Sequence, residues 1–393
     1  MRQLAYVGDD GQIRVVDLDL GGETEISARG RSSPEPAIVC NWPTWSPGGD
    51  RLAFFEYELA GTEVRRAVIR VAAPDGSTVA ALYRLPRGGP VYMCWSPDGE
   101  RMAVLIQEAN ELYLRVIDSQ GQAITVAQGA PLYFVWQPDS RGVLVHAGGG
   151  SPGSDRARLV WVRMEGGQAI QSPVDRPPAR DFRAPAWSKR RDSATFACAL
   201  EDGAEIMVQH GPGEPLDTLT STGPAPVFVW SPDGNRLAFA ARSASHGGAY
   251  AGLSVYDVED RSVSRVSDDP FLAFFWCPDG RRIVYTGGEM GGRMVKIQLI
   301  DTATGERTDL GWVRPSRDVM LLLGHFDQYS QSAHLFSPDG DELVLAASIA
   351  QELKNGSVPT VREIIVRPVT GDGTFQVKRH GRLAFWRPAG RAS

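Results

Sequence analysis

The stretch Trp95-Ser96-Pro97-Asp98-Gly99, followed by a polar pair and the apolar run 102–105, decides the fold of this chain. A second intact copy runs from Trp230 to Gly234 and precedes the apolar run 237–240. Weaker copies complete a series of eight aromatic anchors, which are Trp45, Trp95, Trp136, Trp187, Trp230, Trp276, Phe336 and Trp386. A unit that recurs along a whole chain at roughly 40–50 residues indicates a repeat protein, and this period fits a propeller.

The spacing of the anchors predicts a closed ring. Successive anchors lie 41 to 60 residues apart, and the distance from Trp386 past the C-terminus to Trp45 is 52 residues. That last distance is one more ordinary repeat, as expected when the two termini meet inside one blade of four strands. We therefore expect one all-β propeller domain over residues 1–393. It has eight blades, or seven if Trp187 does not mark a blade boundary.

Local patterns support strands joined by tight turns. Residues 111–118 alternate apolar and polar side chains for much of their length, which is typical of a half-buried strand. In each Ser-Pro-Asp-Gly, proline presets the first central turn position and glycine takes the left-handed one. No segment reads as a long amphipathic helix. We interpret the repeated aspartates as turn residues rather than metal ligands, namely Asp98, Asp139, Asp233, Asp279 and Asp339.

The two ends of the chain carry complementary parts of one repeat. Residues 2–7 match the second strand of a blade with no first strand before it, and residues 383–388 match a first strand with nothing after it. We predict that these segments pair and close the ring. Such pairing removes two sheet edges that would otherwise invite aggregation.

Composition excludes several classes of protein. A formal charge of −6 and a pI near 5.6 argue against a nucleic-acid surface. No stretch approaches the roughly 20 apolar residues of a membrane span, and the first residues lack the apolar run of a signal peptide. We expect a cytoplasmic monomer without a cofactor. Its four scattered cysteines are expected to be buried free thiols.

The Trp-Ser-Pro-Asp-Gly unit resembles the PD40, or WD40-like, repeat of the TolB propeller family, and it is similar to the propellers of tricorn-type and dipeptidyl-peptidase-IV-type proteases. The resemblance implies a propeller used for binding. It does not extend to the N-terminal α/β domain of TolB or to a hydrolase domain. The single Gly-x-Ser-x-Gly match, 149–153, places Pro152 after the serine, where a nucleophile elbow needs a backbone N–H.

The longest repeat holds the main candidate site. Between Trp276 and Phe336 the extra residues fall in 313–318 and 324–334, and they link one blade to the next inner strand, at the channel mouth. Asp181 and Arg183 hold the matching place before Trp187. Four long loops, at 148–155, 243–250, 287–293 and 350–357, share that face, where function tends to sit on a rigid scaffold. The predicted site comprises His325, Asp327, Gln328, Tyr329, His334, Asp181, Arg183, Tyr250 and Glu289.

These residues predict a non-enzymatic binding platform that recognises a protein segment or a small ligand at its loop-rich mouth. The alternative is a hydrolase or lyase acting on a sugar or peptide, which requires His325, His334, Asp327, Arg183 and Asp181 to converge in a deep pocket. A mouth plugged by a loop counts against that alternative. His325, Asp327 and His334 are residue types that suit zinc or manganese, but their spacing is no recognised ligand pattern, so we expect no metal.

Overall fold

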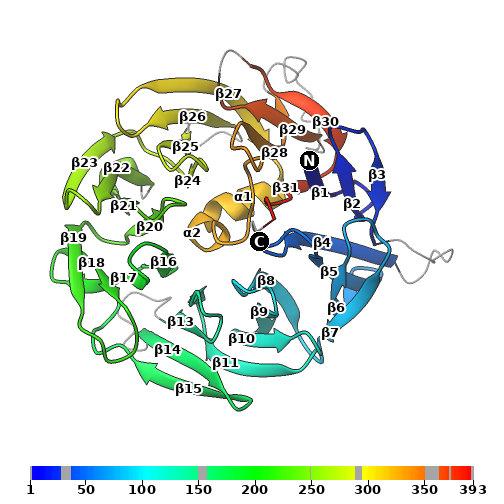
Figure 1. Cartoon of the computed structure of the whole chain (residues 1–393), viewed down its shortest axis with the longest axis horizontal. Helices are drawn as coiled ribbons and strands as arrows, with labels where there is room; N and C mark the ends of the chain where they lie inside the picture. The colour runs from blue at the N-terminus through cyan, green and yellow to red at the C-terminus, as the bar shows by residue number, and fades with distance from the viewer. Residues whose placement is uncertain are drawn as a thin grey trace.

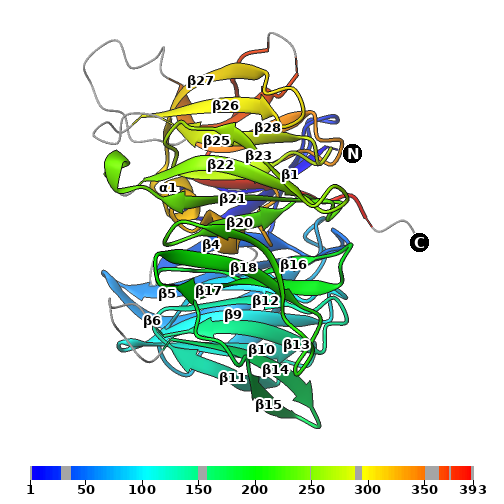
Figure 2. The same ribbon diagram turned by 90° about the vertical axis from the view of Figure 1, so that its left-hand side faces the viewer.

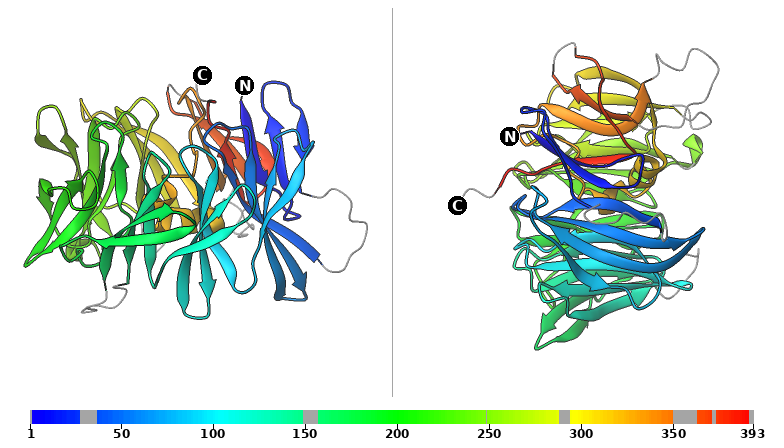
Figure 3. Two further views of the ribbon diagram at one scale, coloured as in Figure 1. Left: turned by 60° about the horizontal axis from the view of Figure 1, so that its bottom comes forward. Right: turned by 90° about the vertical axis from the view of Figure 1, so that its right-hand side faces the viewer.

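The computed structural model describes residues 2–27, 37–148, 157–247, 249–287, 294–349, 363–370 and 373–390. These residues form antiparallel sheets arranged radially around a central axis (Figure 1). Seen from the side, the sheets stand next to one another around the ring (Figure 2). Both ends of the described chain lie on one face of that ring (Figure 3). The fold is the all-β propeller that the repeat predicts.

The first four blades are complete four-stranded sheets. From the centre outward, blade 1 holds β31 (Leu383–Trp386), β1 (Gln3–Val7), β2 (Ile13–Asp17) and β3 (Glu23–Glu25). Blade 2 holds β4 (Ala37–Trp45), β5 (Leu52–Ala60), β6 (Glu63–Ala72) and β7 (Val79–Arg84). Blade 3 holds β8 (Gly89–Trp95), β9 (Arg101–Glu108), β10 (Glu111–Asp118) and β11 (Ala123–Gly129). Blade 4 holds β12 (Leu132–Trp136), β13 (Gly142–Ala147), β14 (Arg158–Glu165) and β15 (Gln168–Pro173).

The remaining blades follow the same order. Blade 5 holds β16 (Ala186–Ser188), β17 (Ser193–Leu200), β18 (Gly203–Gln209) and β19 (Asp217–Thr222). Blade 6 holds β20 (Val227–Trp230), β21 (Arg236–Arg242), β22 (Tyr250–Asp257) and β23 (Ser262–Ser267). Blade 7 holds β24 (Ala273–Trp276), β25 (Arg282–Gly287), β26 (Val295–Asp301) and β27 (Arg307–Pro315). Blade 8 holds β28 (Glu342–Ile349), β29 (Glu363–Pro368) and β30 (Gln376–His380).

Blades 7 and 8 share one seven-stranded sheet, because the end of β27 pairs with the end of β28. The innermost position of blade 8 is held by a single bridge, Phe336 to Leu343. The described residues therefore form seven hydrogen-bonded sheets, whereas the sequence carries eight repeat units. Trp187 lies in β16 and begins a sheet of its own, so the weak fifth repeat marks a real boundary.

The predicted closure of the ring is confirmed. β1 pairs with β31 in antiparallel register from Leu4 opposite Trp386 to Val7 opposite Leu383. An ion pair between Arg2 and Glu342 joins blade 1 to blade 8 beside this seam. Because the last strand occupies the inner position of the first blade, the inner edge of β1 is paired rather than open.

The Ser-Pro-Asp-Gly turns have the predicted geometry. Ser96 Oγ accepts a hydrogen bond from Arg101 N at 2.9 Å and donates one to Asp98 Oδ1 at 2.6 Å. Asp98 Oδ1 also accepts from Glu100 N, and Gly99 has a φ of +79°. The same aspartate-to-backbone bond recurs at Asp139, Asp233, Asp279 and Asp339, which confirms that these carboxylates are turn residues.

Four anchor indoles tie neighbouring blades together. Each donates its Nε1–H to a backbone carbonyl one residue before the anchor of the preceding blade. The bonds are Trp45 to Phe385 (3.3 Å), Trp95 to Thr44 (3.1 Å), Trp136 to Cys94 (3.3 Å) and Trp276 to Val229 (3.0 Å). We call these bonds the indole ties. They satisfy a buried donor and a buried acceptor at once, at the place where two sheets face each other.

The other four anchors depart from this pattern. Trp230 Nε1 donates instead to the hydroxyl of Thr195 at 2.8 Å. Within the described part of the chain, Trp187 Nε1 and Trp386 Nε1 are buried without a hydrogen-bond partner. Phe336 has no N–H to donate. The indole ties are therefore regular from blade 1 to blade 4 and interrupted over most of the remaining ring.

The cysteine prediction is confirmed, since Cys40, Cys94, Cys198 and Cys277 are free and buried. Burial raises the pKa of the Cys94 thiol to about 12, so this group is an inert thiol rather than a nucleophile. No helix in the described ranges is long and apolar enough to cross a membrane.

Candidate functional site

The longest inter-anchor segment folds into two short helices, which the sequence analysis does not predict. α1 (Arg317–Gly324) begins after Ser316, whose Oγ accepts a hydrogen bond from Val319 N at 3.1 Å, and α2 (Phe326–Tyr329) follows directly. Both helices lie in the middle of the propeller ring (Figure 1). We call residues 316–335 the plug, because they fill the channel at the loop-rich mouth that the sequence analysis expects to hold the site.

Apolar side chains explain why the plug is inside the ring. Val319, Leu322, Leu323 and Phe326 are buried and follow one another at helical spacing. The Phe326 ring lies 4.9 Å from Phe274, 6.0 Å from Phe275 and 6.1 Å from Tyr250, measured between ring centroids. This packing anchors the plug to blades 6 and 7.

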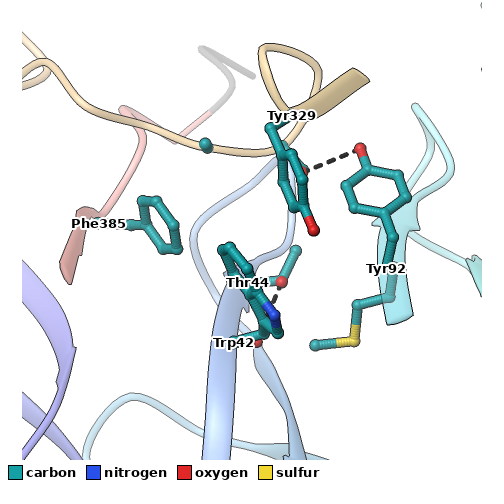
Figure 4. Close-up of a pocket in the computed structure, with 8 residues that line it drawn as sticks. Trp42, Thr44, Tyr92, Tyr329 and Phe385 are labelled. Carbon is teal, nitrogen blue, oxygen red and sulfur yellow. Dashed lines mark hydrogen bonds between the residues drawn. The ribbon is translucent and has the colours of Figure 1, made fainter. Parts of the chain in front are cut away.

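Tyr329 anchors the plug to the opposite side of the ring. Its aromatic ring stacks on Trp42 with centroids 4.8 Å apart and meets Tyr92 edge-on at 4.9 Å (Figure 4). The hollow beside these rings has a free volume of about 10 Å³, enough for no more than one water molecule. Packing rather than ligand binding therefore explains this aromatic cluster.

Polar side chains of the plug bond to inner strands. Gln328 accepts a hydrogen bond from Phe134 N at 2.9 Å and donates one to Phe134 O at 3.0 Å, much as a neighbouring strand would. Its own carbonyl accepts from the Tyr92 hydroxyl at 3.0 Å. Asp327 Oδ2 accepts from Ala184 N at 3.1 Å. These bonds occupy most of the polar groups that Asp327 and Gln328 were predicted to offer a partner, although Asp327 Oδ1 is buried without a hydrogen-bond partner in the described residues.

Arg183 and Tyr250 belong to the wall around the plug. The Arg183 guanidinium donates to the carbonyl of Gly324 at the end of α1, and it lies 4.0 Å from Asp327 Oδ1. Tyr250 is buried, with the guanidinium carbon of Arg242 5.1 Å from the centre of its ring. Arg183 thus contacts the plug at Gly324, and Tyr250 contacts it at Phe326.

The remaining predicted residues are dispersed. His325 is half-buried between the two helices, and its Nδ1 lies 3.3 Å from Leu321 O. Asp181 is exposed and has a φ of +53°. Glu289 lies outside the described residues, as do most of the long loops at 148–155, 287–293 and 350–357. In the fourth long loop, a short 3-10 helix (η1, Ala244–His246) lies at the surface.

A cavity of about 410 Å³ lies between the plug and the inner strands of blades 4 to 8. Its apolar walls are Val135, Ala186, Trp187, Phe228, Val229, Trp230, Pro232, Phe275, Trp276, Ala333, Leu335 and Phe336. Its polar lining is Lys189, Ser231, Asp327, Ser330, Gln331 and His334. Lys189, Ser231 and Pro232 belong to turns between first and second strands, so the cavity lies on the turn side of the plug, away from the loop-rich mouth.

The polar groups of this cavity come mainly from the plug. Burial lowers the pKa of His334 to about 4, so its imidazole is neutral at neutral pH. Within the described residues that imidazole has no hydrogen-bond partner, and only its backbone carbonyl is engaged, by Trp386 N at 2.8 Å. Gln331 donates to Phe134 O at 3.0 Å. His334 and Asp327 are thus the two predicted site residues that line the cavity.

Departures from the repeat converge on this cavity. The second residue after the anchor is proline in seven of the eight repeats and is Lys189 in the fifth. Phe336 is the one anchor that is not tryptophan, and the plug is the largest insertion. All three contribute to the lining. The sequence analysis missed Lys189, although its place in the repeat is a signal that could have identified it.

Comparisons with known proteins support the propeller fold and do not indicate a function. No protein-family model matches the chain, and no curated protein matches it. The structure is similar to that of a eukaryotic initiation factor, with 16% identity, 99% of each chain covered and a TM-score of 0.54. It is also similar to prolyl endopeptidases, with 11% identity, 90% of this chain covered and a TM-score of 0.52. This chain spans about half of the endopeptidase, 50%.

TolB from Acinetobacter baumannii is also among the similar structures, with 16% identity, a TM-score of 0.43 and coverage of 78% of this chain and 77% of TolB. At these identities a similar structure shows a shared propeller fold and nothing about activity.

Proposed function

We propose that this chain is a non-enzymatic binding protein whose ligand site is the cavity between the plug and blades 4 to 8. The observation that carries the proposal is the cavity itself, with its largely apolar wall and a few polar groups that come from the plug and from two turns. Small-molecule sites have this character and typically enclose roughly 300–1,000 Å³. The cavity volume of about 410 Å³ lies within that range.

The plug moves the proposed site away from the loop-rich mouth. Asp327, Gln328 and Tyr329 are buried by contacts within the chain, so a partner at that mouth would have to displace them. On the turn side, Lys189 is exposed and His334 and Gln331 are partly exposed, so these groups are open to a ligand. A cavity of this size favours a small molecule over a protein segment.

The arrangement favours binding over catalysis. The hydrolase or lyase alternative requires five residues to converge, and of these only Asp327 and His334 line the cavity. The Ser231 hydroxyl donates to Asp233 Oδ1 at 2.6 Å, but Ser96 and Asp98 make the same bond in another turn of the repeat, so this pair belongs to the turn rather than to an activated nucleophile. One carboxylate oxygen of Asp327 is already engaged by a backbone N–H.

Thermal unfolding in the presence of small metabolites tests the proposal. The panel contains carboxylates, sugars, nucleosides and amino acids, applied to the natural chain and to Ala186→Phe, which fills the cavity from β16. A ligand present at about 100 times its dissociation constant stabilises the folded state by about 2.7 kcal/mol. We expect at least one compound to raise the unfolding temperature of the natural chain and to leave that of Ala186→Phe unchanged.

Val263→Phe is the matched control, because it adds the same side chain at an exposed position of the outer strand β23. It should respond to the ligand as the natural chain does. Equal responses of the natural chain and Ala186→Phe would place binding elsewhere. Conversion of a panel compound into product would replace the binding proposal with the enzymatic alternative.

A further inference from the structure

We infer that the ligand of this cavity is a small molecule with a flat apolar body and a single carboxylate, oriented with the carboxylate at Lys189. The inference rests on the proposed function, because it specifies the class of ligand that the same cavity would take. Three features of the lining carry it: the charge at the rim, the neutrality of the interior, and the aromatic walls.

Lys189 supplies the unbalanced charge at the rim. It is exposed, and within the described chain no acidic side chain pairs with it. Its neighbours are engaged, since Arg190 donates to Asn235 and Arg191 lies 3.8 Å from Asp217. A free ammonium at the edge of an apolar cavity favours an anionic group, because a charge-assisted hydrogen bond is stronger than a neutral one.

The interior of the cavity adds no further net charge. The carboxylate of Asp327 has the Arg183 guanidinium 4.0 Å away, so these two opposite charges balance each other. The imidazole of His334 is neutral, since burial lowers its pKa to about 4. A ligand that matches this lining carries one negative charge near Lys189 and none at the plug, where His334 and Gln331 can meet a neutral polar group.

Aromatic side chains define the body of the ligand. Trp187, Trp230, Trp276 and Phe336 line the cavity from four successive blades. Trp187 and Phe336 are only partly buried, so their surfaces remain available to a ligand. Flat apolar groups gain most from such walls, because aromatic faces and edges favour stacked and edge-on contacts.

The position of Lys189 in the repeat strengthens the inference. Proline presets the turn at this position in the other seven repeats, and lysine gives up that preorganisation. Places where a sequence breaks its own local rule are expected at functional sites. A ligand-binding cation beside the cavity accounts for the substitution, which the turn itself does not require.

The test compares three probes of the same shape and different charge: indole-3-acetate, indole-3-acetamide and tryptamine. Isothermal titration calorimetry measures each against the natural chain and against Lys189→Pro. We expect the acetate to bind roughly tenfold more tightly than the neutral amide, because a hydrogen bond to a charged group is worth more. Tryptamine should bind most weakly.

In Lys189→Pro the affinity for the acetate should fall to that for the amide. This variant restores the residue of the other seven repeats. Because the fifth turn has its left-handed residue at Asp192 rather than at the glycine position, Lys189→Gln, which removes the charge without a change of backbone, should lose the preference as well. Lys378→Gln is the control, because it removes a partly exposed lysine on the outer strand β30, far from the cavity lining, and it should keep the preference for the acetate.

Equal affinities for the three probes, or a preference that survives in Lys189→Pro, would overturn the carboxylate inference while cavity binding still stands. The inference also fails if no indole probe binds although a neutral compound of the metabolite panel does. Absence of binding by every probe and every panel compound would overturn the proposed function together with it.

Discussion

Two arcs of the same propeller use one repeat differently. From blade 1 to blade 4 the anchors Trp45, Trp95 and Trp136 each donate to the preceding blade, and the repeat builds a uniform wall. From blade 5 around to the seam with blade 1, the ties are lost or redirected at Trp187, Trp230, Phe336 and Trp386, whereas Trp276 keeps its tie. The cavity lies against this second arc. The proposed site is therefore built mostly, though not entirely, from the repeats that depart from the pattern, since Val135 of blade 4 and the regular anchor Trp276 also line it.

The plug connects the two arcs. Tyr329 packs on Trp42 and Tyr92 in the uniform arc, whereas Phe326 packs on Phe274 and Phe275 in the irregular one. The plug thus contacts both arcs at the centre of the ring. The comparison can be tested by weakening each kind of contact separately.

The largest effect is expected from the plug. Phe326→Ala removes a fully buried ring and should lower the free energy of unfolding by about 3–5 kcal/mol, the usual cost of such a truncation. Met320→Ala is the matched control on α1, because Met320 is 42% exposed. It should change stability by no more than about 0.5 kcal/mol. Denaturant unfolding of both variants measures the difference, and similar midpoints would mean that the plug is not packed in the channel.

A smaller effect should separate the two arcs themselves. Trp136→Phe loses an indole tie and leaves the carbonyl of Cys94 without that donor, so we expect a loss of about 1 kcal/mol. Trp187→Phe removes a buried N–H that has no partner in the described structure, and stability should be unchanged or slightly increased. Both replacements remove the same atoms, so the difference between them reports the lost hydrogen bond together with the deeper burial of Trp136, which is 4% exposed whereas Trp187 is only partly buried. Equal losses would contradict the division into arcs.

The features that the sequence predicts correctly are the turns and the closure of the ring, and both depend on short sequence patterns. The Ser-Pro-Asp-Gly turns depend on residues within five positions of one another, and the structure confirms them at Asp98 and its equivalents. The pairing of Leu4 with Trp386 was predictable because each end of the chain carries half of a known repeat. The period of the repeat and the residue types of its turns are sufficient to predict the turns and the ring closure.

The site was harder to predict because it depends on packing between distant segments. The polar residues 325–334 correctly indicate that this insertion lies at the channel. They do not indicate that it is packed inside the ring, which follows from the burial of Val319, Leu322, Leu323 and Phe326. The spacing of these four apolar residues is helical and can be read from the sequence, but it covers only about two turns and stands between segments with the pattern of strands. The cavity itself combines residues of five blades, which no local pattern brings together.

A crystal structure of the chain with indole-3-acetate would test the central claim most directly. The account predicts the indole between the plug and the inner strands of blades 5 to 8, in contact with Trp230 and Trp276. The carboxylate should lie within hydrogen-bond distance of Lys189 Nζ. An empty cavity at saturating acetate, or a ligand bound at the loop-rich mouth instead, would contradict it.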